Sequence, residues 1–267
     1  MQKKLKSRFF HITKNLLNPK KNHVIFKKII TRIYDERVNI SDSEYKDWLN
    51  FHGIEFSEWG QKLSPKTYKE SITFAEKFYA IASNKLKEND FDMGGGALVH
   101  ILYFLTRKFR PRTIVETGVA SGYSSETFLQ ALHKNGQNGN LYSSDFPYFR
   151  VAHPEKYIGQ LVSNHLRNKW KLFTEGDEKN LVKILKEINS IDLFHYDSDK
   201  SIRGRNKVFN KIKKFLSTNS IVMFDDINNN PHFLYLIRKY SINNFIVIKH
   251  KGACVAGIIF WSNEYNE

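Results

Sequence analysis

The spacing of apolar and polar residues divides the chain into a helical first part and an alternating second part. Near the start, four apolar residues recur at helical spacing, and they are Leu5, Phe9, Ile12 and Leu16. Residues 64–88 predict a long helix that begins with a serine and a proline. A glycine run and a second helical pattern follow, ending before Pro111. We predict a basic helical extension over residues 1–93 and a second domain over residues 94–267.

Beyond residue 112, short and nearly continuous apolar runs alternate with amphipathic helical stretches. Seven runs are predicted as strands: 113–116, 141–147, 170–177, 190–197, 220–226, 244–250 and 255–261. This alternation is typical of a doubly wound α/β sheet with helices on both faces. The link between the last two runs is too short for a parallel crossover, so these strands should pair antiparallel. We therefore predict a Rossmann-like, seven-stranded, mostly parallel sheet with an antiparallel last strand.

The charge balance adds an expectation about partners. The chain has 267 residues and a net charge of +15, and residues 1–34 contain ten Lys or Arg and no acid. These residues could contact an anionic membrane surface, or dock on their own domain or on a second subunit of a homo-oligomer. No stretch approaches the roughly 20 apolar residues of a membrane-spanning helix. We expect a cytoplasmic protein, at most peripheral at the inner membrane surface.

Acidic residues stand where several of the predicted strands end. They are Glu116, Asp145, Asp177, Asp197 and the pair Asp225 and Asp226. Because ligands of an open parallel sheet lie beyond the carboxyl ends of its strands, these side chains should gather at one edge. In a chain with far more basic than acidic residues, such a gathering favours a functional role.

The first predicted strand leads into "ETGVASGYSS", residues 116–125. Gly118 and Gly122 permit a tight turn and the close approach of a ligand, and Ala120 keeps the turn small. The loop opens a helix, whose free amide groups favour a carboxylate or phosphate. Its spacing matches neither the dinucleotide fingerprint nor the P-loop.

Two later acids suit a nucleoside. Asp145 lies where an acid can accept hydrogen bonds from both hydroxyls of a ribose. Asp177 could accept from an adenine amino group, but it could equally cap the following helix.

Four segments, "ETGVASGYSS", "LYSSDFP", "DLFHYDSDKS" and "MFDDINNN", together resemble those of class I S-adenosylmethionine-dependent methyltransferases. The resemblance is greatest to the branch with cephalosporin hydroxylase-like and sugar or antibiotic O-methyltransferases, and more distant to catechol and caffeoyl-CoA O-methyltransferases. It covers residues 94–261. It implies that S-adenosylmethionine is bound by the following residues: Glu116, Gly118, Ala120, Gly122, Tyr123, Ser124, Asp145 and Asp177.

The same resemblance implies a metal site and a proton acceptor. Metal-dependent relatives place ligands where this chain has Asp197, Asp225 and Asp226, and three carboxylates suit Mg²⁺. Lys200 corresponds to their general base, if burial or a neighbouring cation depresses its pKa, so Asp197 and Lys200 are the predicted catalytic residues. Two plainer interpretations stay open: the acids are ordinary loop residues, and Lys200 is a solvated surface lysine.

We predict an O-methyltransferase, assisted by a divalent metal, that acts on a hydroxyl of a sugar, a glycan or a secondary metabolite. The basic residues 1–34 suggest an acceptor that is anionic or lipid-linked. A nucleic-acid methyltransferase is a rival supported by the net charge alone, and we expect no nucleic-acid partner. A hydroxylase or oxidoreductase on the same fold is a second rival, but the sequence has neither an iron-binding triad nor a dinucleotide fingerprint. An aromatic segment between Trp48 and Trp59 could form a lid over the acceptor pocket or a separate hydrophobic cluster.

Overall fold

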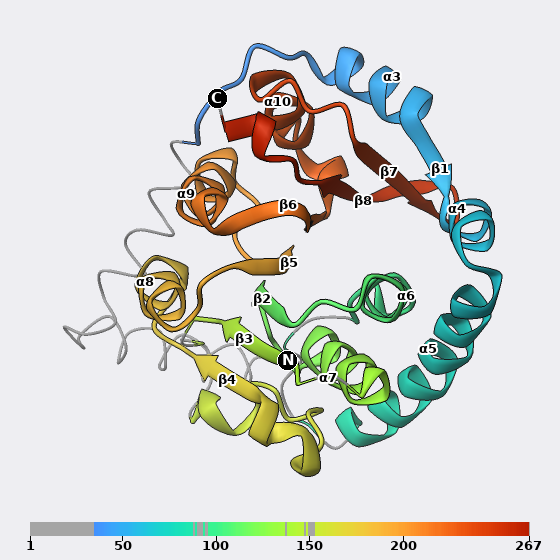
Figure 1. Cartoon of the computed structure of the whole chain (residues 1–267), viewed down its shortest axis with the longest axis vertical. Helices are drawn as coiled ribbons and strands as arrows, with labels where there is room; N and C mark the ends of the chain where they lie inside the picture. Colours follow the sequence, from blue (N-terminus) through green and yellow to red (C-terminus); the bar gives the residue numbers. More distant parts are fainter. Residues whose placement is uncertain are drawn as a thin grey trace, which may run out of the picture.

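The computed structural model describes residues 35–87, 89, 93, 96–136, 138–146, 148 and 153–266. These residues form one eight-stranded sheet with helices on both faces (Figure 1). In the order in which they pair, the strands are β1 (Gly53–Glu55), β7 (Phe245–His250), β8 (Ala253–Phe260), β6 (Leu216–Asp225), β5 (Ile191–Tyr196), β2 (Thr113–Thr117), β3 (Asn140–Ser144) and β4 (Trp170–Phe173). The chain order reverses between β2 and β5, so the ligand-binding crevice expected at such a reversal lies at the carboxyl ends of these strands.

The directions of the strands confirm the predicted fold class and correct the number of strands. β8 pairs antiparallel with both β6 and β7, and the other pairs are parallel. The strand that the sequence did not predict is β1, whose three residues pair in parallel with β7. Three residues are too few to show the alternation of apolar and polar side chains typical of a strand. They are a strand because they pair with β7. The predicted domain boundary after residue 93 stays a prediction, although β1 joins the sheet from the amino-terminal side of it.

The strands alternate their side chains between two hydrophobic cores. Leu193 and Phe194 of β5 belong to different cores, as do Ile114 and Val115 of β2. One core lies beneath α3 (Asp42–His52), α8 (Asp177–Glu187), α9 (Ile202–Ile212) and α10 (His232–Lys239). The other lies beneath α4 (Phe56–Leu63), α6 (Val99–Phe109) and α7 (Tyr123–Asn135). Both faces of the sheet are therefore covered, as Figure 1 shows.

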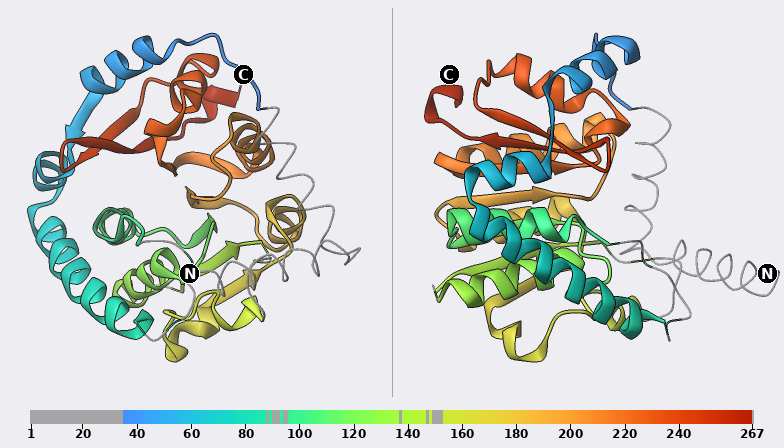
Figure 2. Two further views of the ribbon diagram at one scale, coloured as in Figure 1. Left: turned by 180° about the vertical axis from the view of Figure 1, so that it is seen from behind. Right: turned by 90° about the vertical axis from the view of Figure 1, so that its right-hand side faces the viewer.

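The helix predicted over residues 64–88 is present as α5 (Pro65–Leu86), which packs on the outer side of α6 (Figure 2). The aromatic segment before it forms neither a lid nor a separate cluster. Phe56 and Trp59 are buried in the core beneath α6, and the Trp48 ring lies 5.5 Å from that of Phe245 in β7. Phe51 is 84% exposed.

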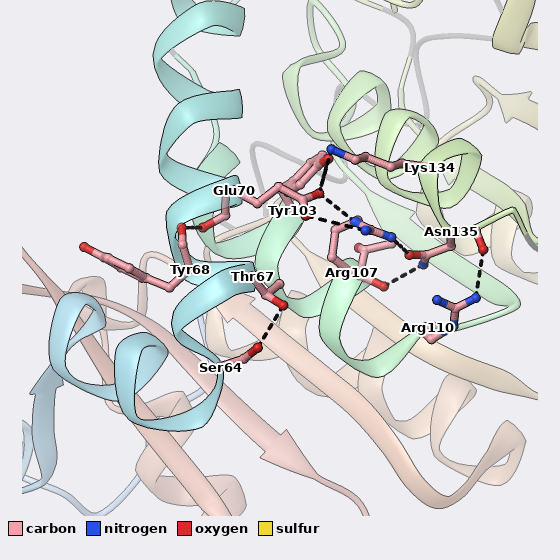
Figure 3. A network of polar contacts seen from close by, with 11 residues as sticks. Ser64, Thr67, Tyr68, Glu70, Tyr103, Arg107, Arg110, Lys134 and Asn135 are labelled. Atoms are coloured by element: carbon pink, nitrogen blue, oxygen red, sulfur yellow. Dashed lines mark hydrogen bonds and ion pairs between the residues drawn. The ribbon is translucent and has the colours of Figure 1, made fainter.

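A polar network ties α5 to α6 and α7 (Figure 3). Glu70 accepts hydrogen bonds from the Tyr103 hydroxyl and from Arg107 Nε, both at 2.8 Å, and Lys134 Nζ lies 3.2 Å away. Arg107 also donates to Asn135 at the end of α7. Burial opposes the charged form of Glu70, but these donors outweigh it and lower its pKa to about 2.

The predicted basic helix near the amino terminus lies outside the described residues. Among the helices that the structure does describe, none combines the length and the apolar character that a bilayer crossing requires.

Candidate functional site

A cavity of about 920 Å³ opens where β2, β3 and β5 end, beside the reversal in chain order. Seven of the predicted site residues line it, and they are Gly118, Ala120, Tyr123, Ser124, Asp145, Asp177 and Asp197. The others do not line it, and these are Glu116, Gly122, Lys200, Asp225 and Asp226. The structure thus brings most of the predicted cofactor residues to one hollow, with Asp197 at its wall.

The loop between β2 and α7 has a backbone that few residues other than glycine adopt. The φ angles of Gly118, Ala120 and Gly122 are 88°, 48° and 96°. A Cβ on Gly118 would lie 2.0 Å from the carbonyl oxygen of Asp197, so the end of β5 leaves no room for a side chain. The loop therefore presents bare backbone to the cavity at the amino end of α7, where negatively charged ligand groups are favoured.

Asp145 follows β3 and fixes this loop from the side. Its Oδ2 accepts hydrogen bonds from the amides of Ala120 at 2.9 Å and Val119 at 3.3 Å, and its Oδ1 accepts from Phe146 N at 2.7 Å. Burial raises the pKa of Asp145 to about 7, with a contribution from the charge of Asp177, while these amides oppose the rise. Asp145 is thus both a brace for the loop and a carboxyl on the cavity wall.

Asp177 is the first residue of α8, whose N-cap is Gly176, so the capping interpretation does not describe it. Its Oδ1 and Oδ2 each accept a hydrogen bond of 2.6 Å, from Ser144 and Ser198 respectively. These contacts join the ends of β3 and β5 and hold the carboxylate at the cavity.

Glu116 and Gly122 do not line the cavity but support its wall. Glu116 is fully buried in β2, and its Oε1 accepts from the hydroxyls of Ser125 and Ser143. Burial raises the pKa of Glu116. A Cβ on Gly122 would lie 2.9 Å from Gly159 Cα, so this glycine allows two backbones to approach. In this arrangement Glu116 braces β2 against α7 and β3.

The three predicted metal ligands lie near one another, but Asp197 and Asp226 face Lys200, whereas Asp225 faces His195. Lys200 Nζ contacts Asp197 Oδ1, and it lies 2.9 Å from Asp226 Oδ2. Asp225 Oδ2 instead lies 3.5 Å from Nε2 of the buried His195. No group of three His, Cys, Asp or Glu side chains within the described ranges could hold a metal ion. The arrangement as it stands does not fit Mg²⁺, and the Lys200 ammonium supplies the positive charge between Asp197 and Asp226.

A lysine that acts as a general base needs a lowered pKa, but the pKa of Lys200 is raised. Burial alone would lower it, but the carboxylates of Asp197 and Asp226 outweigh burial and raise it. Burial and the charge of Asp225 raise the pKa of Asp197. Lys200 is therefore a fixed cation, and Asp197 is a carboxylate of raised pKa at the cavity wall.

Arg205 was not predicted from the sequence, although its side chain binds the backbone of the acid pair, Asp225 and Asp226. This fully buried side chain donates from Nη2 to the carbonyl oxygens of Asp225 and Asp226, at 3.0 Å each. The sequence did contain a signal: Arg205 stands three residues from both Ile202 and Val208, on the apolar face of α9. A charged residue at a core position needs internal partners, and here they are the backbone of the acid pair.

Asn230 lies four residues after Asp226. Its side-chain amide donates to the Lys200 carbonyl oxygen, and its Oδ1 accepts from His232 N at 3.1 Å. Asn230 therefore fixes the loop that carries Lys200.

Residues 115–227 match the family model described as a methyltransferase domain. No curated protein sequence matches the chain at a significant level. Several solved structures have a similar fold. One is the O-methyltransferase TomG from Streptomyces achromogenes, involved in tomaymycin synthesis and solved with S-adenosylmethionine, at 14% identity and a TM-score of 0.54, over 73% of this chain and 96% of that one. Another is a putative caffeoyl-CoA O-methyltransferase from Staphylococcus aureus, at 14% identity and a TM-score of 0.54, over 73% of this chain and 99% of that one.

A third similar structure is a methyltransferase from Geobacter sulfurreducens, at 16% identity and a TM-score of 0.51, over 70% of this chain and 89% of that one. At these identities the structures show the fold, and the family match is a likeness that covers residues 115–227, less than half of the chain. Residues 115–227 are thus similar to a methyltransferase domain and the fold is shared with solved O-methyltransferases, in agreement with the resemblance stated from the sequence.

Proposed function

We propose that this methyltransferase domain transfers the methyl group of S-adenosylmethionine to a hydroxyl oxygen of a sugar, a glycan or a secondary metabolite. The observation that carries the proposal is the cavity that joins the glycine loop, Asp145 and Asp177 to Asp197. A cofactor that fills the loop end of this cavity would leave the Asp197 end for the acceptor.

The roles proposed for the loop end follow from its chemistry. The bare backbone of Gly118 and the amino end of α7 suit the carboxylate of the methionine part. Asp145 and Asp177 offer acceptor oxygens for ribose hydroxyls and an adenine amino group. Ser124 adds a hydroxyl on the same wall.

The transfer itself requires alignment and the removal of one proton. The acceptor oxygen attacks the methyl carbon, the bond from that carbon to sulfur breaks, and its electron pair returns to sulfur to give S-adenosylhomocysteine. The hydroxyl proton goes to the Asp197 carboxylate, the predicted catalytic residue that lines the cavity. Lys200 orients that carboxylate through its ion pair and compensates charge at the acid pair.

The replacement Asp197→Asn tests this assignment. Because an amide cannot take the proton, turnover should fall by roughly 10²-fold or more, while affinity for S-adenosylmethionine changes by less than about threefold. The measurement is single-turnover methyl transfer together with calorimetric titration of the cofactor. Unchanged turnover would show that another group accepts the proton.

Calorimetry also tests the function as a whole. The full-length protein should bind S-adenosylmethionine and S-adenosylhomocysteine and should not bind NAD. Transfer of a tritiated methyl group to hydroxyl compounds then identifies the acceptor class. Binding of NAD alone would favour the oxidoreductase, and transfer to RNA or DNA would favour the nucleic-acid methyltransferase.

Metal assistance stays a prediction, and the transfer step above does not depend on it. Three carboxylates after neighbouring strands support it, whereas the contact of Lys200 with two of them does not. If the prediction holds, turnover of protein treated with EDTA should recover by about tenfold or more on addition of Mg²⁺. Equal turnover with EDTA and with Mg²⁺ would contradict it.

A further inference from the structure

A row of basic side chains on α9 lines the same cavity as the glycine loop. Arg203, Lys207 and Lys211 follow one another at intervals of four residues, so they lie on one face of the helix. With a rise of 1.5 Å per residue, the row extends over roughly 12 Å. It begins beside the end of β5, because a Cβ on Gly204 would lie 2.6 Å from Cγ of Asp199.

The described residues supply no ion-pair partner for these three cations. Within the described part of the chain, their side chains form no ion pair and no hydrogen bond. Three acids lie beside α9: Asp35 accepts from the amides of Ile202 and Arg203 at 2.9 Å each, Glu36 accepts from Asn206 Nδ2 at 2.8 Å, and Asp199 lies next to Gly204. Residues 1–34 contain no acid that could neutralise the row. Three positive charges along one cavity wall repel one another, and a bound anion would offset this repulsion.

The acids of the cavity lie at the strand ends and at the start of α8, and of these Asp199 lies beside the first turn of α9. They are Asp145, Glu175, Asp177, Glu178, Asp197 and Asp199, and α8 also contributes Lys179. Several of them have partners of their own: Glu175 pairs with Lys183, Asp197 pairs with Lys200, and Asp199 accepts from Ser201 N. The cavity therefore has an acidic end at the strand termini and a basic wall along α9.

The geometry points to α9 as the binding site for a phosphate-bearing part of the acceptor. A hydroxyl placed at Asp197 would leave the rest of the acceptor to extend along Arg203, Lys207 and Lys211, whose spacing suits two or more phosphates. This inference rests on the proposed function of the cavity and adds the chemical class of the acceptor to it. A sugar nucleotide and a lipid-linked diphosphate both carry such phosphates, so the same site suits either one.

Lysine footprinting of the full-length protein tests the site directly, with tripolyphosphate as the probe. At about 0.15 M salt, acetylation of Lys207 and Lys211 should fall by roughly threefold or more when tripolyphosphate is present. Lys66, Lys69 and Lys77 on α5 are exposed and lie outside the cavity, so their acetylation should change little. Equal protection of both sets, or protection of neither, would overturn the inference.

Matched variants provide the second measurement. Removing the row in R203Q/K207Q/K211Q should weaken tripolyphosphate binding by about tenfold, whereas K66Q/K69Q/K77Q removes the same charge and should weaken it by less than about twofold. If the two variants bind tripolyphosphate equally weakly, the net charge of the protein attracts the probe and α9 carries no specific site.

Titration with S-adenosylhomocysteine distinguishes failure of this inference from failure of the proposed methyl transfer. Both variants should bind S-adenosylhomocysteine within about twofold of the unchanged protein, since the row is not assigned to the cofactor. If neither the unchanged protein nor the two variants bind S-adenosylhomocysteine, the proposed function is rejected. The lysine footprint then tests the phosphate site on its own. Once an acceptor is known, soluble sugar nucleotides and vesicles with lipid diphosphates distinguish its two sources.

Discussion

At the scale of single residues, the site is organised by carboxylates that serve as structural partners and face the cavity at the same time. Asp145 fixes the glycine loop through the amides of Val119 and Ala120, and it also lines the cavity. Its raised pKa follows from this position, because a buried carboxylate has lost the hydration of its charge. A ribose that donates two hydrogen bonds would favour the ionised form and compensate part of that loss.

The affinity for S-adenosylhomocysteine should therefore depend on pH through Asp145. Since its pKa is raised to about 7, affinity should rise between about pH 6 and pH 8 as the carboxylate ionises. Asp145→Asn should weaken binding by roughly tenfold at pH 8 and flatten the pH dependence. Calorimetric titration over this range is the measurement, and Asp47→Asn on the exposed surface of α3 is the control. An unchanged pH profile in Asp145→Asn would remove Asp145 from the ribose site.

Arg205 acts through the backbone of the acid pair. Arg205→Met should leave the carbonyl oxygens of Asp225 and Asp226 without their donor and lower the free energy of unfolding by about 2 to 3 kcal/mol. Because the acid pair would lose its position beside Lys200, turnover should fall more than cofactor affinity does. Chemical denaturation and steady-state kinetics measure the two effects. Equal stability and turnover would mean that the acid pair is held without Arg205.

At the scale of elements, the packing of α5 against α6 and α7 depends on a charge as well as on apolar contacts. Glu70 is the shared acceptor of this network (Figure 3). Its folded-state pKa of about 2 lies below its ordinary value, so ionised Glu70 stabilises the fold above about pH 4.5, and this contribution is lost as the pH falls toward 2.

Glu70→Gln should consequently lower the free energy of unfolding by about 1 to 3 kcal/mol at pH 7. The difference from the unchanged protein should shrink as the pH falls below 4.5 and vanish near pH 2, which urea denaturation at several pH values can follow. Glu76→Gln alters an exposed residue of the same helix and should change stability little. A difference that is constant with pH would assign the effect of Glu70 to packing and not to its charge.

The elements also show what a sequence can predict and what it cannot. Seven strands could be predicted because each is a nearly continuous apolar run, and α5 because a serine and a proline open a long helical pattern. β1 could not, since its three residues become a strand by pairing with β7. The strand-end rule found Asp145, Asp177 and Asp197 of the cavity wall, and the glycine loop and the family resemblance supplied four more residues. Neither could predict that Lys200 would contact Asp197 and Asp226 or that Asp225 would face His195. Which side chains pair depends on rotamers and tertiary contacts that local spacing does not encode.

At the scale of the whole molecule, two groups of positive charges differ in their sequence character. The α9 row lies within the folded domain, whereas ten cations are concentrated in residues 1–34, where Leu5, Phe9 and Ile12 recur at helical spacing. We propose that the second group brings the protein to anionic membranes. An acceptor attached to lipid would then meet the cavity at the membrane surface.

Sedimentation with vesicles tests this proposal on the full-length protein. Each Lys or Arg near an anionic surface contributes about 1 kcal/mol, so replacing Lys3, Lys4, Lys6 and Arg8 by Gln should weaken binding to vesicles with phosphatidylserine by well over about tenfold. Replacing four exposed lysines of α4 and α5, Lys62, Lys66, Lys69 and Lys77, removes the same charge and should have a much smaller effect. Neither protein should bind neutral vesicles strongly, because the attraction is electrostatic and falls with salt. If the two variants bind anionic vesicles equally, the net charge of the molecule drives the contact and residues 1–34 have no special part in it.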